Sequence, residues 1–359
     1  MRSSASRSAL ALIASVGLAV VGCTPAVSPY AQSQQWREGH FENPPEWPHR
    51  TGVKDVLKWR LQPRPPSHVR PFVAPYQPND GQRLRANAGG PERSVTFIGH
   101  ASVLLQAGGV SMLTDPVFSD DVGGLFRRAA PPGVALRDLP PIDLVVISHN
   151  HRDHLDEESV RALGPSVHYV VPLGLGAWFR ARGLTRVTEL DWWQSTVVEG
   201  RAGRATVTLV PAQHWSQRAA TDRNQSLWGG YVIDAGGERV FFAGDTGYPA
   251  AFAEVGRRFP GIELAILPIG AYAPRWFMHP QHMAPEETAQ AFRDLGARIL
   301  LPVHWATFRL SDEPMDEPPK LLYQAMGTLA NRILFLPIGG SWFSGGPAPS
   351  VGPAGHAGR

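Results

Sequence analysis

The stretch VVISHNHRDHL, residues 145–155, decides the fold of this chain. The apolar, β-branched run at 144–147 is typical of a buried strand. A loop that leaves such a strand can direct its side chains at a common centre, because the strand fixes where the loop begins. Four side chains with metal-binding groups stand in this loop: His149, His151, Asp153 and His154.

Imidazole nitrogens and a carboxylate oxygen suit zinc or a similar ion. The spacing predicts that His149 and His151 bind one ion, and that Asp153 and His154 bind a second ion beside it. The alternative is a polar loop with surface histidines. We favour the metal site, because four such side chains rarely fall this close by chance and three further candidates lie downstream.

The three further candidates each follow a predicted strand: His214 after 207–210, Asp245 after 240–244 and His304 after 299–303. Each of the three alone is weak evidence for a metal site, since a histidine at a strand end is more often structural and Gly-Asp-Thr is often a turn. Strand ends that gather at one edge of a sheet sandwich are, however, where a ligand cavity forms.

Together the seven residues predict a binuclear centre. The first ion takes His149, His151 and His214, the second takes Asp153, His154 and His304, and Asp245 bridges both. Each ion then keeps an open position for water, as a catalytic site needs. A closed structural site usually fills its positions with cysteine, and this chain has a single cysteine.

Short strands alternate with helical patterns from residue 94 onward. This order predicts an α/β fold, an αββα sandwich with two mixed β-sheets inside and helices outside. We expect strands at 95–98, 103–105, 110–113, 144–147, 167–171, 187–190, 196–199, 205–210, 227–233, 239–243, 264–267 and 299–301, and helices at 53–61, 157–163, 174–182 and 285–295. The stretch bounded by Pro131-Pro132 and Pro140-Pro141 is expected to be irregular.

The N-terminus is typical of an exported protein. Residues 1–22 combine Arg2 and Arg7 with an apolar run that is too short to span a bilayer, and they predict a lipoprotein signal peptide. Val20-Val21-Gly22-Cys23 resembles the lipobox of bacterial lipoproteins, so we expect Cys23 to carry lipid. The alternatives are an ordinary signal peptide or a membrane anchor with an incidental cysteine.

This N-terminus predicts a lipid-anchored protein on the extracytoplasmic or periplasmic face of a bacterial cell envelope. Thr24 stands where an aspartate would retain a lipoprotein at the inner membrane, which favours the outer membrane where there are two. We expect residues 23–92 to form a Pro-rich extension that packs partly on the core, 93–344 to form the catalytic domain, and 345–359 to form a disordered Gly/Pro-rich tail.

Composition excludes some partners and leaves others open. The 43% hydrophobic fraction of the 359 residues is enough for a large core. The net charge of +3 falls to +1 once residues 1–22 are removed, which gives no electrostatic reason to expect nucleic acid. The oligomeric state, monomer or homodimer, is not determined by the sequence.

The seven-residue pattern resembles the metallo-β-lactamase superfamily, and longer stretches resemble its N-acylphosphatidylethanolamine-hydrolysing phospholipase D branch. The resemblance runs from about residue 41 to about residue 336. Its most specific stretches are FIGHASVLLQ (97–106), ELDWWQS (189–195), PAQHWSQR (211–218), DRNQSLWGGYVI (222–233), LPIGAYAPRWFM (267–278) and PVHWATF (302–308). The chain departs from the family at two places: residues 120–140 differ from the family pattern, and Ala273 stands where relatives often carry an acid. Both departures bear on which substrate is bound more than on the chemistry.

The resemblance implies two Zn²⁺ per chain and a phospholipid substrate, which a metal-bound hydroxide hydrolyses to phosphatidic acid and an N-acylethanolamine. Zinc lowers the pKa of a bound water from about 15.7 to roughly 7. Asp153 and His282 are the implied catalytic residues, with His282 beside the substrate phosphate. Asp115 is expected to accept a hydrogen bond from a metal-binding imidazole, and His100 either does the same or is a plain turn residue.

Six aromatic side chains are candidates for an acyl-chain groove or for the core: Trp192, Trp193, Trp215, Trp228, Trp276 and Phe277. Two other functions stay open. The same fold also suits a lactonase or esterase, and a non-catalytic metal- or lipid-binding lipoprotein would need only part of the site. The complete set of predicted ligands favours the hydrolase.

Overall fold

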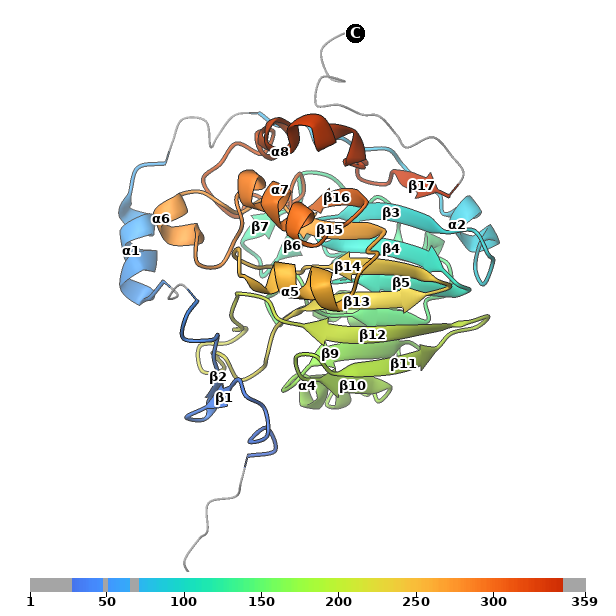
Figure 1. Ribbon diagram of the computed structural model, residues 1–359, viewed down its shortest axis with the longest axis horizontal. Coiled ribbons are helices and arrows are strands. Elements are labelled where there is room, and N and C mark those ends of the chain that lie inside the picture. Colours follow the sequence, from blue (N-terminus) through green and yellow to red (C-terminus); the bar gives the residue numbers. More distant parts are fainter. Residues whose placement is uncertain (1–27, 48–50, 65–70, 345–359) are drawn as a thin grey trace, which may run out of the picture.

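The computed structural model describes residues 28–47, 51–64 and 71–344. Cys23, the predicted signal peptide and the predicted C-terminal tail lie outside these residues. Two large mixed sheets face each other, with helices on both outer faces (Figure 1). The predicted αββα sandwich is therefore confirmed.

The first sheet has seven strands in the order β10-β9-β8-β5-β4-β3-β17. Their bounds are β3 Ser94–Gly99, β4 Ser102–Ala107, β5 Val110–Thr114, β8 Leu144–Val146, β9 His168–Pro172, β10 Val187–Leu190 and β17 Ser341–Phe343. Parallel pairs are β5 with β8, β8 with β9 and β9 with β10. Antiparallel pairs are β17 with β3, β3 with β4 and β4 with β5.

The second sheet has six strands in the order β11-β12-β13-β14-β15-β16. Their bounds are β11 Ser195–Glu199, β12 Arg204–Val210, β13 Gly230–Ala235, β14 Glu238–Phe242, β15 Leu264–Pro268 and β16 Ile299–Val303. The pairs from β11 to β14 are antiparallel, and those from β14 to β16 are parallel. Two small hairpins complete the strands: β1 Trp36–Arg37 with β2 His40–Phe41, and β6 Asp121–Val122 with β7 Phe126–Arg127.

Alternation along the strands separates the layers, because successive side chains point to opposite faces of a sheet. Val240 and Phe242 pack between the two sheets, whereas Phe241 faces the outer helices of the second sheet. Val145 likewise packs under the outer helices of the first sheet, while Val146 faces the space between the sheets. The core is therefore three apolar layers.

The helices cover the outer faces or extend from one end of the sandwich. Their bounds are α1 Val53–Leu61, α2 Gln82–Ala86, α3 Glu157–Leu163, α4 Gly176–Arg180, α5 Ala251–Arg258, α6 Arg275–Met278, α7 Pro285–Asp294 and α8 Pro318–Met326, with 3₁₀ turns η2 Leu136–Asp138 and η3 Gly327–Arg332. α7 shows how local sequence sets such bounds. Pro285 occupies its first turn, where the missing N–H costs nothing, and the Glu287 carboxylate accepts from Ala284 N at 2.7 Å.

The element predictions were right where a strong local pattern exists. The helices at 53–61 and 157–163 and the strand at 187–190 have the predicted bounds. One prediction was wrong, because the strand expected from Leu227 begins at Gly230. The β6–β7 hairpin lies in a part of the chain for which no strand was predicted.

The part of the chain before residue 93 contacts the core directly. Asn43 Nδ2 donates to the carbonyl of His214 at 2.9 Å, and Phe41 N donates to the carbonyl of Asn224 at 2.8 Å. Phe41 is fully buried. Residues 28–47 are therefore packed beside one of the predicted metal ligands. No helix in the described parts of the chain has both the length and the apolar character needed to cross a bilayer.

Candidate metal centre

The predicted ligands meet because six strands point the same way. Following the pairings, β3, β5 and β8 run parallel in the first sheet, and β12, β14 and β16 run parallel in the second. The carboxyl ends of strands with the same direction lie at one edge of a sheet, and this is where open α/β sheets bind ligands. The residues that follow these six ends are His100, Asp115, His149–His154, His214, Asp245 and His304.

Three histidines form the first group, as predicted for the first ion. His149 Nε2 lies 2.8 Å from His151 Nδ1, which lies 3.3 Å from His214 Nε2. His149 and His214 are almost completely buried. Three ring nitrogens that converge in this way offer one ion three ligands.

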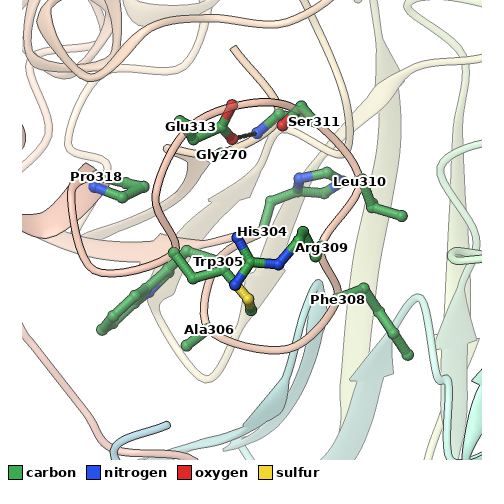
Figure 2. Close-up of a pocket in the computed structure, with 12 residues that line it drawn as sticks. Gly270, His304, Trp305, Ala306, Phe308, Arg309, Leu310, Ser311, Glu313 and Pro318 are labelled. Carbon is green, nitrogen blue, oxygen red and sulfur yellow. Dashed lines mark hydrogen bonds between the residues drawn. The ribbon is translucent and has the colours of Figure 1, made fainter. Parts of the chain in front are cut away.

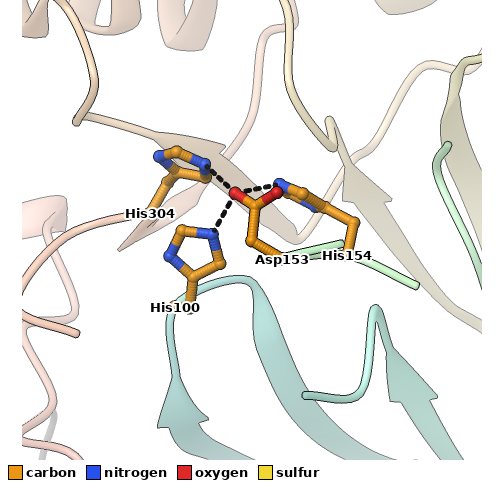
Figure 3. Close-up of side chains that lie close together, drawn as sticks. All are labelled: His100, Asp153, His154 and His304. Atoms are coloured by element: carbon orange, nitrogen blue, oxygen red, sulfur yellow. Dashed lines mark hydrogen bonds and ion pairs between the residues drawn. The ribbon is translucent and has the colours of Figure 1, made fainter. Parts of the chain in front are cut away.

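The second group gathers around the Asp153 carboxylate (Figure 3). Asp153 Oδ2 lies 3.5 Å from His154 Nε2 and 3.7 Å from His304 Nε2. His100 Nε2 lies 3.1 Å from the same oxygen, so His100 hydrogen-bonds the carboxylate rather than standing in a plain turn. These four side chains can hold a second ion among them, with His100 as a ligand or as a support for Asp153.

Asp245 contacts members of both groups. Its Oδ2 lies 3.2 Å from His154 Nε2, 4.0 Å from His149 Nε2 and 3.9 Å from His214 Nε2. Its Oδ1 lies 3.1 Å from His304 Nε2. Asp245 therefore has the position that a bridging carboxylate requires.

The donor set fits cations. His154 Nε2, His304 Nε2 and Asp245 Oδ1 are buried and have no hydrogen-bond partner among the described residues. A buried polar atom without a partner costs free energy, typically about 1–3 kcal/mol, and a bound ion would remove this cost at all three atoms. The same imidazole and carboxylate chemistry is that of zinc sites.

The electrostatics of the centre also favour positive charge. Burial lowers the pKa of His151 to about 4 and that of His214 to about 3, so both rings are neutral and able to bind metal at neutral pH. Burial also opposes a proton on His304, but Asp245 and Asp153 together outweigh it and the pKa rises to about 9. The pKa of His154 is raised for the same reason. A field that retains protons on these two rings will also attract a cation in their place.

Hydrogen bonds behind the ligands fix their orientation. Asp115 is fully buried, and its carboxylate accepts from His154 Nδ1 at 2.6 Å and from Ser148 Oγ at 2.5 Å. Ser148 Oγ in turn lies 2.9 Å from His149 Nδ1. Asp115 thus supports one ligand of the second group directly and one of the first group through Ser148. The role of Ser148 was not predicted, although its place between the strand and the first histidine was visible.

The remaining supports come from distant segments, which no local pattern could indicate. His214 Nδ1 lies 3.0 Å from the carbonyl of Gln281, so Nδ1 donates and Nε2 is left as the ligand atom. Thr307 Oγ1 accepts from the backbone N of His100 at 2.7 Å. His282, next to Gln281, brings Nδ1 to 3.9 Å from Asp245 Oδ2 without making a hydrogen bond there.

The aromatic candidates divide among the core, the border of the metal centre and the surface. Trp192 and Trp228 are buried, and the Nε1 of Trp192 donates to the carbonyl of Trp228 at 2.7 Å, so the groove interpretation is wrong for this pair. Trp215 borders the centre, with its ring centroid 4.4 Å from that of His151. Trp276 is 40% exposed.

A small hollow that is open to solvent adjoins the centre at His304 (Figure 2). The loop after β16 curls around it, and Glu313 in this loop accepts from Ala271 N at 2.7 Å and from Ala273 N at 3.0 Å. The Glu313 carboxylate therefore ties the wall of the hollow to the segment after β15. Arg309, Ser311 and apolar residues complete the lining.

Comparison with known proteins places this geometry in a family. Residues 111–305 match the model of the β-lactamase superfamily domain. The chain is 33% identical, over 79% of its length and 86% of the relative's, to N-acyl-phosphatidylethanolamine-hydrolyzing phospholipase D 1 of Caenorhabditis elegans. It is 36% identical, over 63% of its length and 50% of the relative's, to the mitochondrial enzyme of that name in Saccharomyces cerevisiae.

Solved structures show the same fold. Igni18, a metallo hydrolase from the archaeon Ignicoccus hospitalis, superimposes with a TM-score of 0.54 at 21% identity, over 70% of this chain and 98% of its own. At this identity the likeness concerns the fold alone. The family model and the C. elegans relative carry the assignment: the chain belongs to the metallo-β-lactamase superfamily of metal-dependent hydrolases, in the branch of the N-acylphosphatidylethanolamine-hydrolysing phospholipases D.

Proposed function

We propose that the protein is a zinc-dependent phosphodiesterase of the phospholipase D type, acting on N-acylphosphatidylethanolamine-type phospholipids. The observation that carries this proposal is the pair of ligand groups joined by Asp245. The name of the C. elegans relative, which the chain matches over most of both lengths, supports the substrate class.

Zinc is the proposed metal because the site offers five imidazoles and two carboxylates and no thiolate. His149, His151 and His214 would hold one ion, and Asp153, His154 and His304 the other, with Asp245 between them. When bound, two such ions supply Lewis acidity and lower the pKa of water, which is the chemistry that hydrolysis of a phosphodiester needs.

The residues of the chain would position the reactants. In the proposed reaction the oxygen of water forms a bond to phosphorus, the bond from phosphorus to the N-acylethanolamine oxygen breaks, and that oxygen takes up a proton. Phosphatidic acid and an N-acylethanolamine are the products. His282, which lies beside Asp245 but is not bonded to it, is the proposed donor to a phosphoryl oxygen or to the departing alcohol. His100 would hold Asp153 in its orientation.

The proposed location agrees with a lipid substrate. We propose that Cys23 carries lipid and anchors the chain to the bacterial cell envelope. Residues 28–47 pack beside His214, so a chain tethered just before them would keep the predicted centre near the membrane that holds its substrate. A phospholipid is the proposed small-molecule partner.

The test is turnover by the purified, zinc-loaded protein. N-acylphosphatidylethanolamine in mixed micelles should yield equal amounts of phosphatidic acid and N-acylethanolamine, measured by mass spectrometry. An acyl-homoserine lactone serves as the competing substrate. Opening of the lactone without cleavage of any phosphodiester would replace the proposal by a lactonase, and bound zinc with no turnover of either would favour a binding protein.

A further inference from the structure

The helix α1 presents its apolar side to solvent. Its large apolar residues Val53, Val56, Leu57 and Leu61 are 68%, 39%, 57% and 83% exposed. At about 100° per residue they lie within one arc of roughly 140°, which also contains Arg60. A surface helix normally turns such a stripe toward the core. The apolar face of α1 therefore points to solvent, which is not expected of a helix that serves only to cover the core.

A different residue fastens α1 to the protein. Trp59 is buried, stacks on Phe277 of α6 with ring centroids 4.9 Å apart, and donates from Nε1 to Asp312 Oδ2 at 2.8 Å. Trp59 lies roughly opposite the exposed stripe on the helix, because residues advance by about 100° each. The exposure of the stripe is thus maintained by a specific attachment on the other side.

The neighbouring helix α6 extends the exposed surface. Trp276 is 40% exposed, and Lys58 Nζ lies 4.4 Å from the centroid of its ring. Arg275, the residue before Trp276, donates to the carbonyl of His282 at 2.9 Å. The surface formed by the exposed side of α1 and by Trp276, here called the α1–Trp276 face, is therefore connected to the segment that reaches the metal centre.

The charges around the α1–Trp276 face are positive. Lys54, Lys58 and Arg60 are exposed on α1. Asp55 is the one acidic residue of the helix, and its carboxylate accepts from Gly52 N at 2.8 Å instead of facing outward with the stripe. Exposed apolar residues with an arginine among them and lysine at their border, and with tryptophan alongside, are typical of helices that lie in the interface of an anionic bilayer.

We propose that the α1–Trp276 face docks on a bilayer that contains anionic phospholipid, with the apolar stripe of α1 entering the interfacial layer. Lysine and arginine can extend along the stripe to reach the headgroups. This contact is additional to any lipid on Cys23. It goes beyond the proposed phosphodiesterase activity, because it concerns which face of the protein meets the membrane.

The experiment attaches an environment-sensitive dye to a single cysteine in the full chain. Cys23→Ser removes the native thiol, the only one in the sequence, and Leu57→Cys puts the dye on α1. The matched control is Val197→Cys, which is 51% exposed on β11, on the far side of Figure 1 from α1. Vesicles of phosphatidylcholine and phosphatidylglycerol, with and without brominated acyl chains, are then added.

With these vesicles the dye at 57 should shift its emission to shorter wavelength and lose intensity to the brominated chains, whereas the dye at 197 should do neither. Adding Leu61→Glu should abolish the shift at 57. The proposal is overturned by an unchanged spectrum at 57, by equal shifts at 57 and 197, or by an equal shift with phosphatidylcholine alone. A shift without vesicles that grows with protein concentration would assign the face to a second copy of the chain. None of these readouts requires turnover, so failure of the proposed activity would leave them unaffected.

Discussion

Replacing Asp115 by asparagine is expected to weaken binding of the second ion while the protein stays folded. The Asp115 carboxylate accepts from Ser148 N at 2.7 Å through Oδ1, and from Ser148 Oγ and His154 Nδ1 through Oδ2. The amide keeps the first acceptor but puts an NH₂ group where Oδ2 was. His154 Nδ1 then has to accept, so the ring proton moves to Nε2, which faces Asp245 at 3.2 Å. A protonated ring nitrogen cannot bind a cation.

The expected loss of metal affinity can be estimated from the one metal-binding histidine, His154, that loses its partner directly. Loss of a partner behind a metal-binding histidine typically costs about 10- to 100-fold in metal affinity, or about 1.4–2.8 kcal/mol. The loss should concentrate on the ion held by His154, since His149 is connected to Asp115 only through Ser148.

The assay is calorimetric titration of Zn²⁺ into the metal-free protein, with thermal unfolding as the check on folding. Asp143→Asn is the matched control, because Asp143 stands at the other end of β8 and accepts from Ser111 N at 2.9 Å. Two sites of unchanged affinity in Asp115→Asn would refute the reasoning from the ring proton. An equal loss in the control would show that the effect is general destabilisation.

Three further predictions concern other parts of the chain. Asp245→Asn should abolish hydrolysis with little change in thermal unfolding, because the carboxylate between the two groups loses its charge; wild-type turnover would contradict the bridging role. Cys23→Ser should remove the lipid anchor, so that a high-salt wash, which screens the contact of the α1–Trp276 face with anionic lipid, moves the protein to the soluble fraction; an uncleaved product that stays membrane-bound would overturn the lipobox interpretation. Glu157→Gln should lower the free energy of unfolding near neutral pH, because Arg182 and Arg161 depress the pKa of Glu157 to about 2. A depressed carboxyl pKa stabilises the fold above its unfolded value near 4.5, and this advantage over the variant should disappear as the pH falls toward 2; a difference that persists there would contradict the assignment.

The sequence alone determined the features that depend on neighbouring residues. The apolar spacing of 53–61 and 157–163 predicted two helices with the observed bounds, because helical periodicity is a local property. The run at 144–147 marked the central strand for the same reason. The seven predicted ligands could be named because each is a metal-binding type directly after a strand, and strands of one direction end at one edge.

Short strands that form only through pairing with another strand were not predicted from the sequence. The strand β17 has three residues and exists through its pairing with β3, some 250 positions earlier. The hairpin β6–β7 was not predicted either, and its strands have two residues each. Strands this short carry no periodicity, so only the folded chain selects their partners.

Tertiary structure alone decided how the predicted ligands are supported and which faces stay exposed. The contact of Asp245 with both ligand groups and the bond from His214 Nδ1 to Gln281 join segments that are far apart in sequence. The exposed stripe of α1 has the pattern of a buried one, and only the attachment of Trp59 to Phe277 and Asp312 turns it outward. Periodicity shows that a helix has an apolar side, but which way this side points depends on contacts made elsewhere in the fold.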